Sequence, residues 1–414
     1  MKKKIAVLVD LELSNRAGGH VKYWQRISEI ILKEKIDFEL TIFFLGKSSQ
    51  KRKLSSHLFY MIKKPIFSSK NLRFLGIDAD QTDLFPINPF LLFELKKYDL
   101  IHTTDQFFSM ASTALLASRL WKIPITTSIH TDTPPYTKYY ITNILNNFLF
   151  KFLGLNNFLI KKVMIPNLFE KRMLKKLYRY IEKVNHAMVA DQIYSPSKLI
   201  NCTKNSNITK LNRGVVKSIF YRKKISTSKI KEKYCIPKKD RILFFSGRVH
   251  KLKGAILLAE VHNKLVSKGF SVSTIMAGED IHGDHCKIIA PEKLHVLGYL
   301  PQNEIANLYT VCDLFVFPSQ YEIGPNVVLE AKACGAVCLV SPNGGGKRIN
   351  KNGWDGIIID EFTAEKWTKK IEYLFNKGQD IKEIKKNLSN LYIKNWSEVF
   401  FNDIYIHWKK KLSR

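Results

Sequence analysis

Short apolar runs alternate with longer amphipathic segments along most of the chain. Residues 5–10 form the first apolar run, and apolar residues then recur at helical spacing over 20–33. Short runs bounded by polar loops are typical of buried strands, and the segments between them are long enough for crossover helices. This alternation predicts parallel sheets covered by helices.

The pattern predicts seven strands in the first half of the chain and six in the second. The predicted strands cover 5–10, 38–45, 72–76, 100–102, 124–128, 187–189, 209–211, 242–246, 273–276, 295–297, 314–317, 337–340 and 356–359. The predicted helices cover 20–33, 107–120, 254–268, 302–311, 326–334 and 364–376, and the tail over 381–414 is also expected to be helical.

The alternation is interrupted by a polar stretch rich in Lys and Ser over 218–240. A chain of 414 residues exceeds the size that one hydrophobic core usually supports. We therefore predict an N-terminal Rossmann-like domain over 1–217, a linker over 218–240 and a C-terminal Rossmann-like domain over 241–395. A C-terminal helix over 396–414 is expected to pack back towards the N-terminal domain.

Composition excludes disorder and gives no sign of a disulfide-rich or membrane-spanning protein. A hydrophobic content of 45% leaves material for two cores. The six cysteines lack the spacing of a disulfide framework or a zinc site, which favours reduced thiols in the cytoplasm. The apolar run near the start stops at Asp10, so we predict a strand there rather than a signal peptide, and no run is long enough to span a bilayer.

The chain is strongly basic, with 67 Lys and Arg against 36 Asp and Glu and a net charge of +31. Residues 47–73 hold eight basic residues and no acid, and residues 151–183 hold nine basic residues against two acids. Apolar residues are interleaved with the second stretch, so residues 145–183 suit an amphipathic surface on anionic lipid. A helix that packs its apolar stripe on its own domain is the alternative.

Two carboxylates flank a predicted loop-to-helix junction. Gly324 suits an N-cap and Pro325 a first helical position, with Glu322 before the helix and Glu330 inside it. The free backbone N–H groups at such a helix end bind anions. A carboxylate on each side of an anion site suits a nucleotide-sugar, which carries hydroxyls at both ends and phosphates in the middle.

Two cations follow the predicted strand over 242–246. Arg248 and Lys253 flank a turn with small residues, which lets the backbone and both cations approach a diphosphate. Lys251 is a weaker candidate for the same role.

Together these segments resemble the retaining glycosyltransferases of family 4, which have the GT-B fold: two Rossmann-like α/β domains facing each other across a cleft. The resemblance implies that Glu322 and the backbone of Gly324, Pro325 and Asn326 hold the donor sugar. It also implies that Glu330 binds the ribose.

The same resemblance assigns the diphosphate to Arg248 and Lys253. It places Gly19 in a glycine loop that faces the donor phosphate, and His130, in the His-Thr-Asp element, next to the donor sugar. The chain departs from the family at Lys347, where an acid is usual. The resemblance is strongest over 244–346.

We therefore predict a retaining, metal-independent hexosyltransferase that uses a UDP- or GDP-sugar and no cofactor. Its expected acceptor is a membrane lipid, a lipid-linked saccharide or lipopolysaccharide, reached from the cytoplasmic face of an anionic membrane during glycolipid or polysaccharide biosynthesis. The expected catalytic residues are His130, Arg248, Lys253 and Glu322.

Five alternatives stay open. The acceptor can be a soluble saccharide, or the protein can be a phosphorylase or an inactive scaffold of the same fold. The charge alone also fits nucleic-acid binding, although RNA-reading motifs are absent and no nucleic acid is expected as a partner. His282, His285 and Cys286 have metal-ligand residue types but lie in a polar loop with no complementary cluster.

Overall fold

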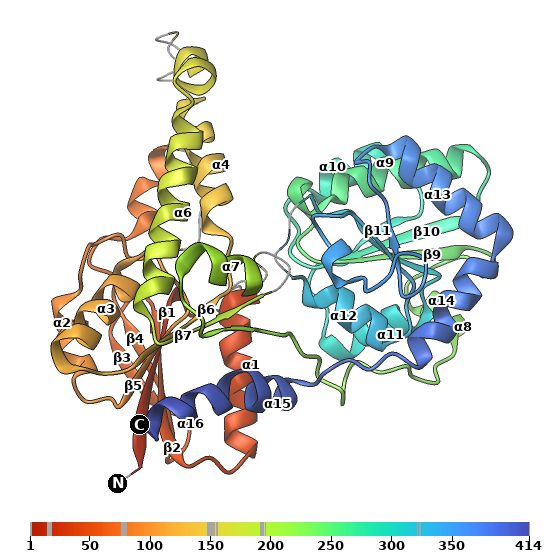
Figure 1. The fold of residues 1–414 in the computed structure, drawn as a ribbon. Helices are drawn as coiled ribbons and strands as arrows, with labels where there is room; N and C mark the ends of the chain where they lie inside the picture. The colour runs from red at the N-terminus through yellow and green to blue at the C-terminus, as the bar shows by residue number, and fades with distance from the viewer. Residues whose placement is uncertain are drawn as a thin grey trace. The chain divides into compact units, whose positions relative to one another are not determined.

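The computed structural model describes residues 2–14, 19–75, 81–146, 154, 156–190, 194, 196–320, 322 and 324–413. The chain divides into two compact units, each with its own sheet (Figure 1). Unit 1 consists of Met1–Asn212 together with Trp396–Arg414, and unit 2 consists of Arg213–Asn395.

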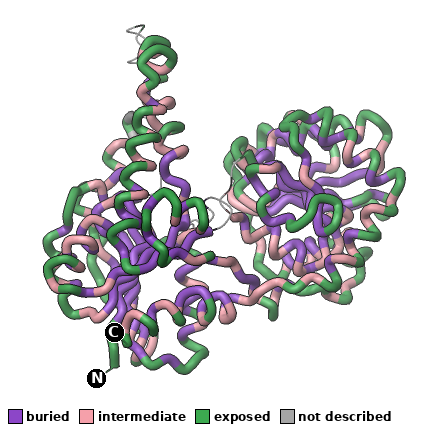
Figure 2. The backbone as a smooth tube through the Cα atoms, viewed as in Figure 1, coloured by how far each residue is buried: buried purple, intermediate pink, exposed green. Residues whose placement is uncertain are grey.

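Unit 1 is built on an eight-stranded sheet with the order β3-β4-β2-β1-β5-β6-β7-β8. All of its strand pairs are parallel except β3–β4, which is antiparallel. The strands are β1 (Lys3–Glu12), β2 (Phe38–Leu45), β3 (Gln50–Lys53), β4 (Leu58–Lys63), β5 (Leu100–Thr103), β6 (Ile125–Ile129), β7 (His186–Val189) and β8 (Ile208–Lys210). The central strands β1 and β6 have buried residues on both faces (Figure 2), which for β1 explains the continuous apolar run.

Helices cover the sheet of unit 1. They are α1 (Gly19–Lys33), η1 (Ser69–Leu75), α2 (Pro89–Leu95), α3 (Ser109–Trp121), α4 (Thr133–Leu145), η2 (Phe158–Lys162), α6 (Ile165–Lys183) and α7 (Pro196–Thr203). The helices α4 and α6 pack against each other and extend away from the sheet (Figure 1). Among the described helices, none is long and apolar enough to cross a bilayer.

The edge of this sheet differs from the prediction. Residues 69–75 form a 3₁₀ helix, so the strand predicted over 72–76 is wrong for its described part. The sheet edge is instead formed by β4, whose residues alternate between buried and half-buried, and by β3, whose four residues are all exposed. Lysines on an exposed edge strand hide the usual strand pattern and also discourage pairing with other chains.

Unit 2 is built on a six-stranded, fully parallel sheet with the order β11-β10-β9-β12-β13-β14. Its strands are β9 (Arg241–Ser246), β10 (Val272–Ala277), β11 (Leu294–Val296), β12 (Leu314–Phe317), β13 (Cys338–Val340) and β14 (Ile357–Ile358). Its helices are α8 (Thr227–Lys233), η3 (Lys251–Lys253), α9 (Ala255–Ser267), α10 (Gly283–Ile289), α11 (Gln302–Val311), α12 (Asn326–Ala333), η4 (Gly346–Arg348), α13 (Ala364–Lys377) and α14 (Gln379–Ser389). The α/β class with two parallel-sheet domains is confirmed.

Residues 218–240, predicted as a linker, are part of unit 2 in the structure. They contain α8, and Phe220, Ile230 and Ile236 are buried in the hydrophobic core of this unit. These three apolar side chains anchor a segment whose Lys and Ser residues mostly face solvent, so composition alone suggested a linker.

The end of the chain returns to unit 1 as α15 (Trp396–Val399), the π-helix η5 (Phe400–Tyr405) and α16 (Ile406–Leu412). Trp408 is fully buried there. The Asp403 carboxylate accepts a hydrogen bond of 2.7 Å from the backbone N–H of Asn212. The last residues of the chain therefore complete the core of the first unit.

Candidate active site

The loops at the carboxyl edge of the sheet of unit 2 touch one another. Gly278, after β10, donates its N–H to the Gly298 carbonyl, after β11, at 2.7 Å. Gly278 has a φ of +142°, and a Cβ at this position would lie 2.0 Å from the Gly247 carbonyl oxygen, after β9. Ligands of open parallel sheets bind at this carboxyl edge, so the predicted donor residues lie where the fold favours binding.

A second glycine sets the position of Lys253. The short helix η3 ends at Lys253, and Gly254 follows with a φ of +80°. A Cβ on Gly254 would lie 2.1 Å from the carbonyl oxygen of Pro318, which follows β12. The close approach of the two loops requires glycine here, and it brings Lys253 to the residues that follow β12.

The ammonium group of Lys253 forms an ion pair with the Glu322 carboxylate. Both side chains are about one-fifth exposed, at 18% and 20%. The loop that carries Glu322 is fixed by its own backbone, because the Glu322 N–H donates to the Asn343 carbonyl at 2.9 Å. The structure thus brings together the two charges that the sequence assigned to the diphosphate and the sugar.

Arg248 and Lys251 lie close to Lys253 in sequence and are exposed. Arg248 occupies the loop directly after β9, and Lys251 is the first residue of η3. Both cations are therefore accessible to an anion at this end of the sheet.

The helix α12 begins at Asn326, the first residue of the predicted range, but its cap differs from the prediction. Pro325 is the N-cap with an extended backbone (φ −66°, ψ 122°), so the prediction of Gly324 as N-cap is wrong. The Gly324 carbonyl accepts a hydrogen bond of 3.2 Å from the Arg348 guanidinium, which keeps this residue outside the helix. The amino end of α12 still follows Glu322 directly.

Glu330 lies on α12, half-buried. Burial and, after it, the charge of Glu330 raise the pKa of the Tyr309 hydroxyl well above its usual value. The carboxylate is therefore close to the aromatic core at α11.

A small cavity of about 160 Å³ lies at the same edge of unit 2. It is lined by Gln320, Ser341, Pro342, Asn343, Ile359, Asp360, Glu361 and Phe362. These residues follow β12, β13 and β14, and Asn343 is the backbone partner of Glu322.

In unit 1, Gly19 is the first residue of α1, and residues 15–18 of the predicted glycine loop lie outside the described part of the chain. The next residue, His20, stacks on His130 with ring centroids 4.5 Å apart. His130 directly follows β6 and is buried. The structure thus brings the predicted glycine segment and the predicted histidine together at the carboxyl edge of this sheet.

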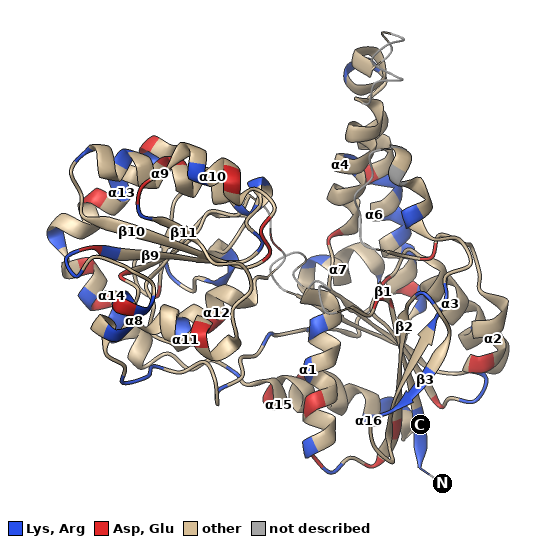
Figure 3. Ribbon diagram, turned by 180° about the vertical axis from the view of Figure 1, so that it is seen from behind, with Lys and Arg blue, Asp and Glu red and all other residues tan. Residues whose placement is uncertain are grey.

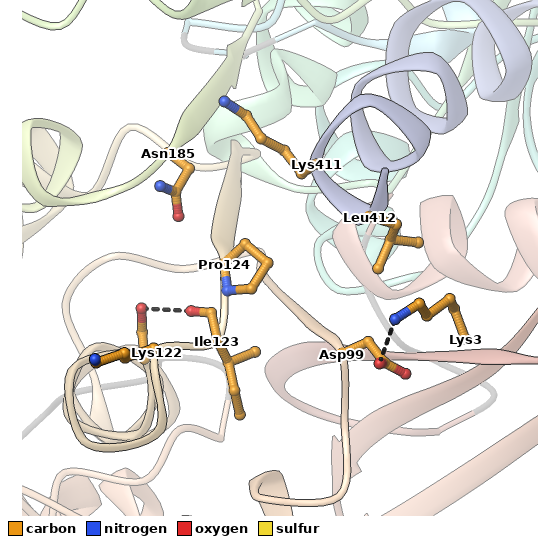
Figure 4. A pocket seen from close by; sticks show the side chains of 9 residues that line it. Lys3, Asp99, Lys122, Ile123, Pro124, Asn185, Lys411 and Leu412 are labelled. Carbon is orange, nitrogen blue, oxygen red and sulfur yellow. Dashed lines mark hydrogen bonds and ion pairs between the residues drawn. The ribbon is translucent and has the colours of Figure 1, made fainter. Parts of the chain in front are cut away.

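Unit 1 also has a larger pocket, of about 490 Å³, at the opposite end of its strands (Figure 4). It is lined by Lys3, Asp99, Ser118, Lys122, Ile123, Pro124, Asn185, Lys411 and Leu412. These residues precede the strands or end the helices, so the pocket lies at the amino edge. It is separate from His130 and is not our candidate.

The comparisons with known proteins agree with this geometry. Residues 226–390, which lie in unit 2, match the family model described as "Glycosyl transferases group 1". Over these residues, unit 2 is similar to the glycosyl transferases group 1 family.

Two curated relatives have related names. The Escherichia coli protein named UDP-Gal:alpha-D-GlcNAc-diphosphoundecaprenol alpha-1,3-galactosyltransferase is 28% identical over 145 residues, which is 33% of this chain and 37% of that protein. The Campylobacter jejuni protein named N,N'-diacetylbacillosaminyl-diphospho-undecaprenol alpha-1,3-N-acetylgalactosaminyltransferase is 32% identical over 121 residues, covering 26% of this chain and 32% of that protein. The matches therefore span about a third of each relative's own length.

The structure of Anabaena Alr3699/HepE in complex with UDP and glucose covers 100% of both chains with a TM-score of 0.65 and 14% identity. At this identity the likeness establishes the fold alone. The two parallel-sheet units have the GT-B fold, as predicted.

Arg348 is a charged residue of unit 2 that sequence reasoning missed. Arg348 is buried, and burial, with Arg213 adding to it, lowers the pKa of its guanidinium to about 9. It stands beside Gly324, where a Cβ would lie 2.3 Å from the guanidinium. The exposed neighbour, Lys347, occupies the position where the family usually has an acid. The Lys-Arg pair after a glycine run was the available signal.

The metal alternative finds no support in the geometry of this domain. Cys286 is buried in the core, and burial raises the pKa of its thiol to about 11, so the metal-binding thiolate is scarce at neutral pH. Over the described ranges, no group of three or more His, Cys, Asp or Glu side chains is placed to hold a metal ion.

Proposed function

We propose that this protein is a retaining hexosyltransferase of family 4 that transfers a hexose from a UDP- or GDP-sugar to a lipid-linked acceptor at the cytoplasmic face of a membrane. The ion pair between Lys253 and Glu322 carries this proposal. It brings a cation and a carboxylate together at the carboxyl edge, shortly before the amino end of α12, and this supports a donor site there.

The donor site combines three kinds of group. Lys253 and Arg248 supply the cations for the diphosphate, and the free N–H groups at the start of α12 add donors for the same anion. Glu322 accepts hydrogen bonds from sugar hydroxyls, and Glu330 from the ribose.

When the bond to the sugar breaks, negative charge develops on the leaving diphosphate. These groups stabilise that charge more strongly in the transition state than in the bound donor. Fixed cations and N–H donors that face the developing charge stabilise the transition state without reorganisation, and each such donor is worth roughly 10²–10³ in rate. In our proposal they take the place of a metal ion. Turnover in the presence of EDTA is therefore expected to equal turnover without it, and loss in EDTA with rescue by a divalent ion would contradict the metal-free mechanism.

The acceptor proposal rests on α6 and the segment before it. The carboxyl half of α6 packs Leu177 and Ile181 into the core of unit 1, as an ordinary amphipathic helix does. The amino half leaves Leu168 and Phe169 exposed, at 56% and 41%, and Phe158 in η2 is also exposed. Residues 147–153 and 155, which include the remaining aromatic residues of this segment, lie outside the described residues.

Basic residues accompany this apolar surface. Lys161, Lys162, Lys171, Arg172 and Lys175 are exposed along η2 and α6, and Figure 3 shows Lys and Arg on α6. Each Lys or Arg near an anionic surface contributes about 1 kcal/mol. A surface that combines several of them with exposed Phe and Leu suits peripheral docking on anionic lipid.

The relatives support the same class of acceptor, since the Escherichia coli and Campylobacter jejuni proteins are both named for diphospho-undecaprenol acceptors. A soluble saccharide is the second candidate.

Vesicle flotation separates the two acceptor classes. The protein is expected to float at physiological salt with vesicles that contain phosphatidylglycerol and not with pure phosphatidylcholine. Leu168→Ser with Phe169→Ser should abolish flotation. The matched control is Phe90→Ser with Phe93→Ser on α2, where both rings are also exposed. Flotation that is lost only in the control would place the membrane contact on α2, and no flotation of the natural protein would end the membrane proposal.

A further inference from the structure

A buried row of polar side chains connects the end of the chain to His130. The indole N–H of Trp408 donates to Nδ1 of His102 at 3.3 Å. Nε2 of His102 lies 2.9 Å from the Ser128 hydroxyl, and the same hydroxyl lies 2.7 Å from Nε2 of His130. Trp408, His102 and Ser128 are fully buried, and all four residues belong to unit 1.

The chemistry of each group gives the row a single direction. An indole nitrogen can only donate, so Nδ1 of His102 must accept, and Thr126, at 2.8 Å from the same nitrogen, donates as well. A neutral imidazole that accepts at one nitrogen carries its proton on the other. Nε2 of His102 therefore donates to the Ser128 oxygen.

The direction continues to His130. A hydroxyl has one proton and two acceptor lone pairs. Among the described residues, the two histidine rings are the hydrogen-bond partners of the buried Ser128 hydroxyl, and its oxygen accepts from His102. Its proton therefore has an acceptor only if it is donated to Nε2 of His130. That nitrogen then accepts, and the proton of the neutral His130 ring is on Nδ1.

The surroundings keep His102 neutral and hold the rings in place. Burial, followed by the nearby His186, lowers the pKa of His102 to about 3, so the ring carries no charge at neutral pH. Trp24 stacks on Trp408 with an interplanar angle of 8°. His20 and Tyr23 pack against His130, with centroids at 4.5 and 4.6 Å.

We propose that His102 and Ser128 are positioning residues, anchored by Trp408, that fix His130 as the tautomer with its proton on Nδ1. His130 then acts as a neutral N–H donor through Nδ1. The consequence for catalysis rests on the proposed function: the proton on Nδ1 is the one that His130 offers to a sugar oxygen. Trp408, on α16, thereby influences His130 through His102 and Ser128.

Nitrogen NMR of the full chain with ¹⁵N-labelled histidine tests the tautomer without any substrate. His130 is assigned by the signal lost in His130→Gln. The natural protein is expected to show a protonated Nδ1 and an unprotonated Nε2 at His130. A protonated Nε2 at His130 would overturn the proposal.

Two variants break the row, and each has a matched control. Ser128→Ala is expected to convert His130 to a mixture of tautomers, and Trp408→Phe to shift His102 and, through it, His130. The control for Ser128→Ala is Ser109→Ala, because over the described residues the buried Ser109 hydroxyl has no hydrogen-bond partner. The control for Trp408→Phe is Trp367→Phe, because Trp367 is also fully buried and donates its indole N–H, but it lies in unit 2. An unchanged His130 signal in folded Ser128→Ala would also overturn the proposal.

Kinetics add a separate result. Ser128→Ala should lower donor turnover by about tenfold to a hundredfold, less than the roughly 10²–10³ lost with a preorganised donor itself, and Ser109→Ala should not. If Ser128→Ala turned over the donor as fast as the natural protein, the catalytic role of the positioning residues His102 and Ser128 would be overturned. If no nucleotide-sugar is turned over, the proposed function fails, while the NMR spectra still decide the tautomer.

Discussion

Lys253 and Glu322 form an ion pair at the carboxyl edge of the sheet of unit 2, although 69 positions separate them in the chain. Two structural features produce this contact. Gly254 allows the loop after β9 to touch Pro318, and the backbone bond to Asn343 holds the loop of Glu322. The two loops therefore hold the ion pair in place at the edge of the sheet. Side chains held in this way on loops are more typical of a binding site than of a contact that stabilises the fold.

Replacing Lys253 with Met should separate catalysis from stability. We expect donor turnover to fall by roughly 10²–10³, because a fixed cation at the leaving group is lost. The melting temperature should change little, because partly exposed ion pairs contribute only about 0–1 kcal/mol. Lys251→Met, in the same short helix and exposed, is the control and should keep most of the turnover. A large fall in melting temperature with unchanged turnover per folded molecule would show that Lys253 is structural.

Glu330→Gln should weaken binding of the nucleoside diphosphate. The ribose hydroxyls lose a charged acceptor, which corresponds to about 1.5–3 kcal/mol of binding free energy. Titration calorimetry with UDP and GDP measures this directly. Glu365→Gln, an exposed residue on α13, is the control and should bind as the natural protein does. Equal affinity of Glu330→Gln and the natural protein would remove Glu330 from the ribose site.

Gly254→Ala should destabilise the folded protein more than Gly269→Ala does. Both glycines have a positive φ, +80° and +82°, so alanine strains the backbone at each by about 1–3 kcal/mol. At Gly254 the new Cβ meets another chain segment, whereas at Gly269 no atom of the described residues lies within 4 Å of it. Urea unfolding should therefore show a lower midpoint for Gly254→Ala. Equal midpoints would mean that the contact with Pro318 is not as close as described.

The buried His102 should make stability depend on pH below neutrality. Its pKa is lowered to about 3 in the folded state, mainly by burial, from a usual value of 6.5. Between these two pKa values, His102 is protonated in the unfolded chain and neutral in the folded protein. The contribution of His102 to stability is complete above pH 6.5 and decreases as the pH falls towards 3.

Comparison with His102→Gln isolates this effect from the other titrating groups. The variant should be less stable than the natural protein at pH 7, and the difference should shrink by about 1.4 kcal/mol for each pH unit below 6.5. Urea unfolding at several pH values gives both curves. Parallel curves would show that His102 titrates in the folded state much as it does in the unfolded chain.

Local patterns predicted the class of fold and the positions of most strands. The continuous apolar runs of β1 and β9 are typical of strands buried on both faces, and Gly-rich turns marked their carboxyl ends. The pattern failed at β3, because Gln50–Lys53 is fully exposed and has no apolar side to recognise. It also missed the anchoring of 218–240, where three isolated apolar residues outweigh a polar composition.

The sequence predicted individual residues of the candidate site but not the contacts between them. The motifs around Lys253 and Glu322 identified both residues, but their contact depends on how two loops meet. For Arg348 the sequence offered only the Lys-Arg pair after a glycine run, because its burial next to Gly324 is a property of the folded chain. For His102 the sequence offered no signal, because its burial between β6 and α16 depends on the fold. Arg and His in a sequence are usually assumed to face solvent, and these two buried residues are exceptions that only the structure shows.

A screen of nucleotide-sugars tests the central claim most directly. The purified full chain is incubated with a panel of UDP- and GDP-hexoses, and release of the nucleoside diphosphate is followed over time. Slow hydrolysis of one donor is predicted, with the rate strongly reduced in Lys253→Met and preserved in Lys251→Met. The claim would be contradicted if no donor were hydrolysed and calorimetry showed no binding of either UDP or GDP, or if Lys253→Met and Lys251→Met were equally active.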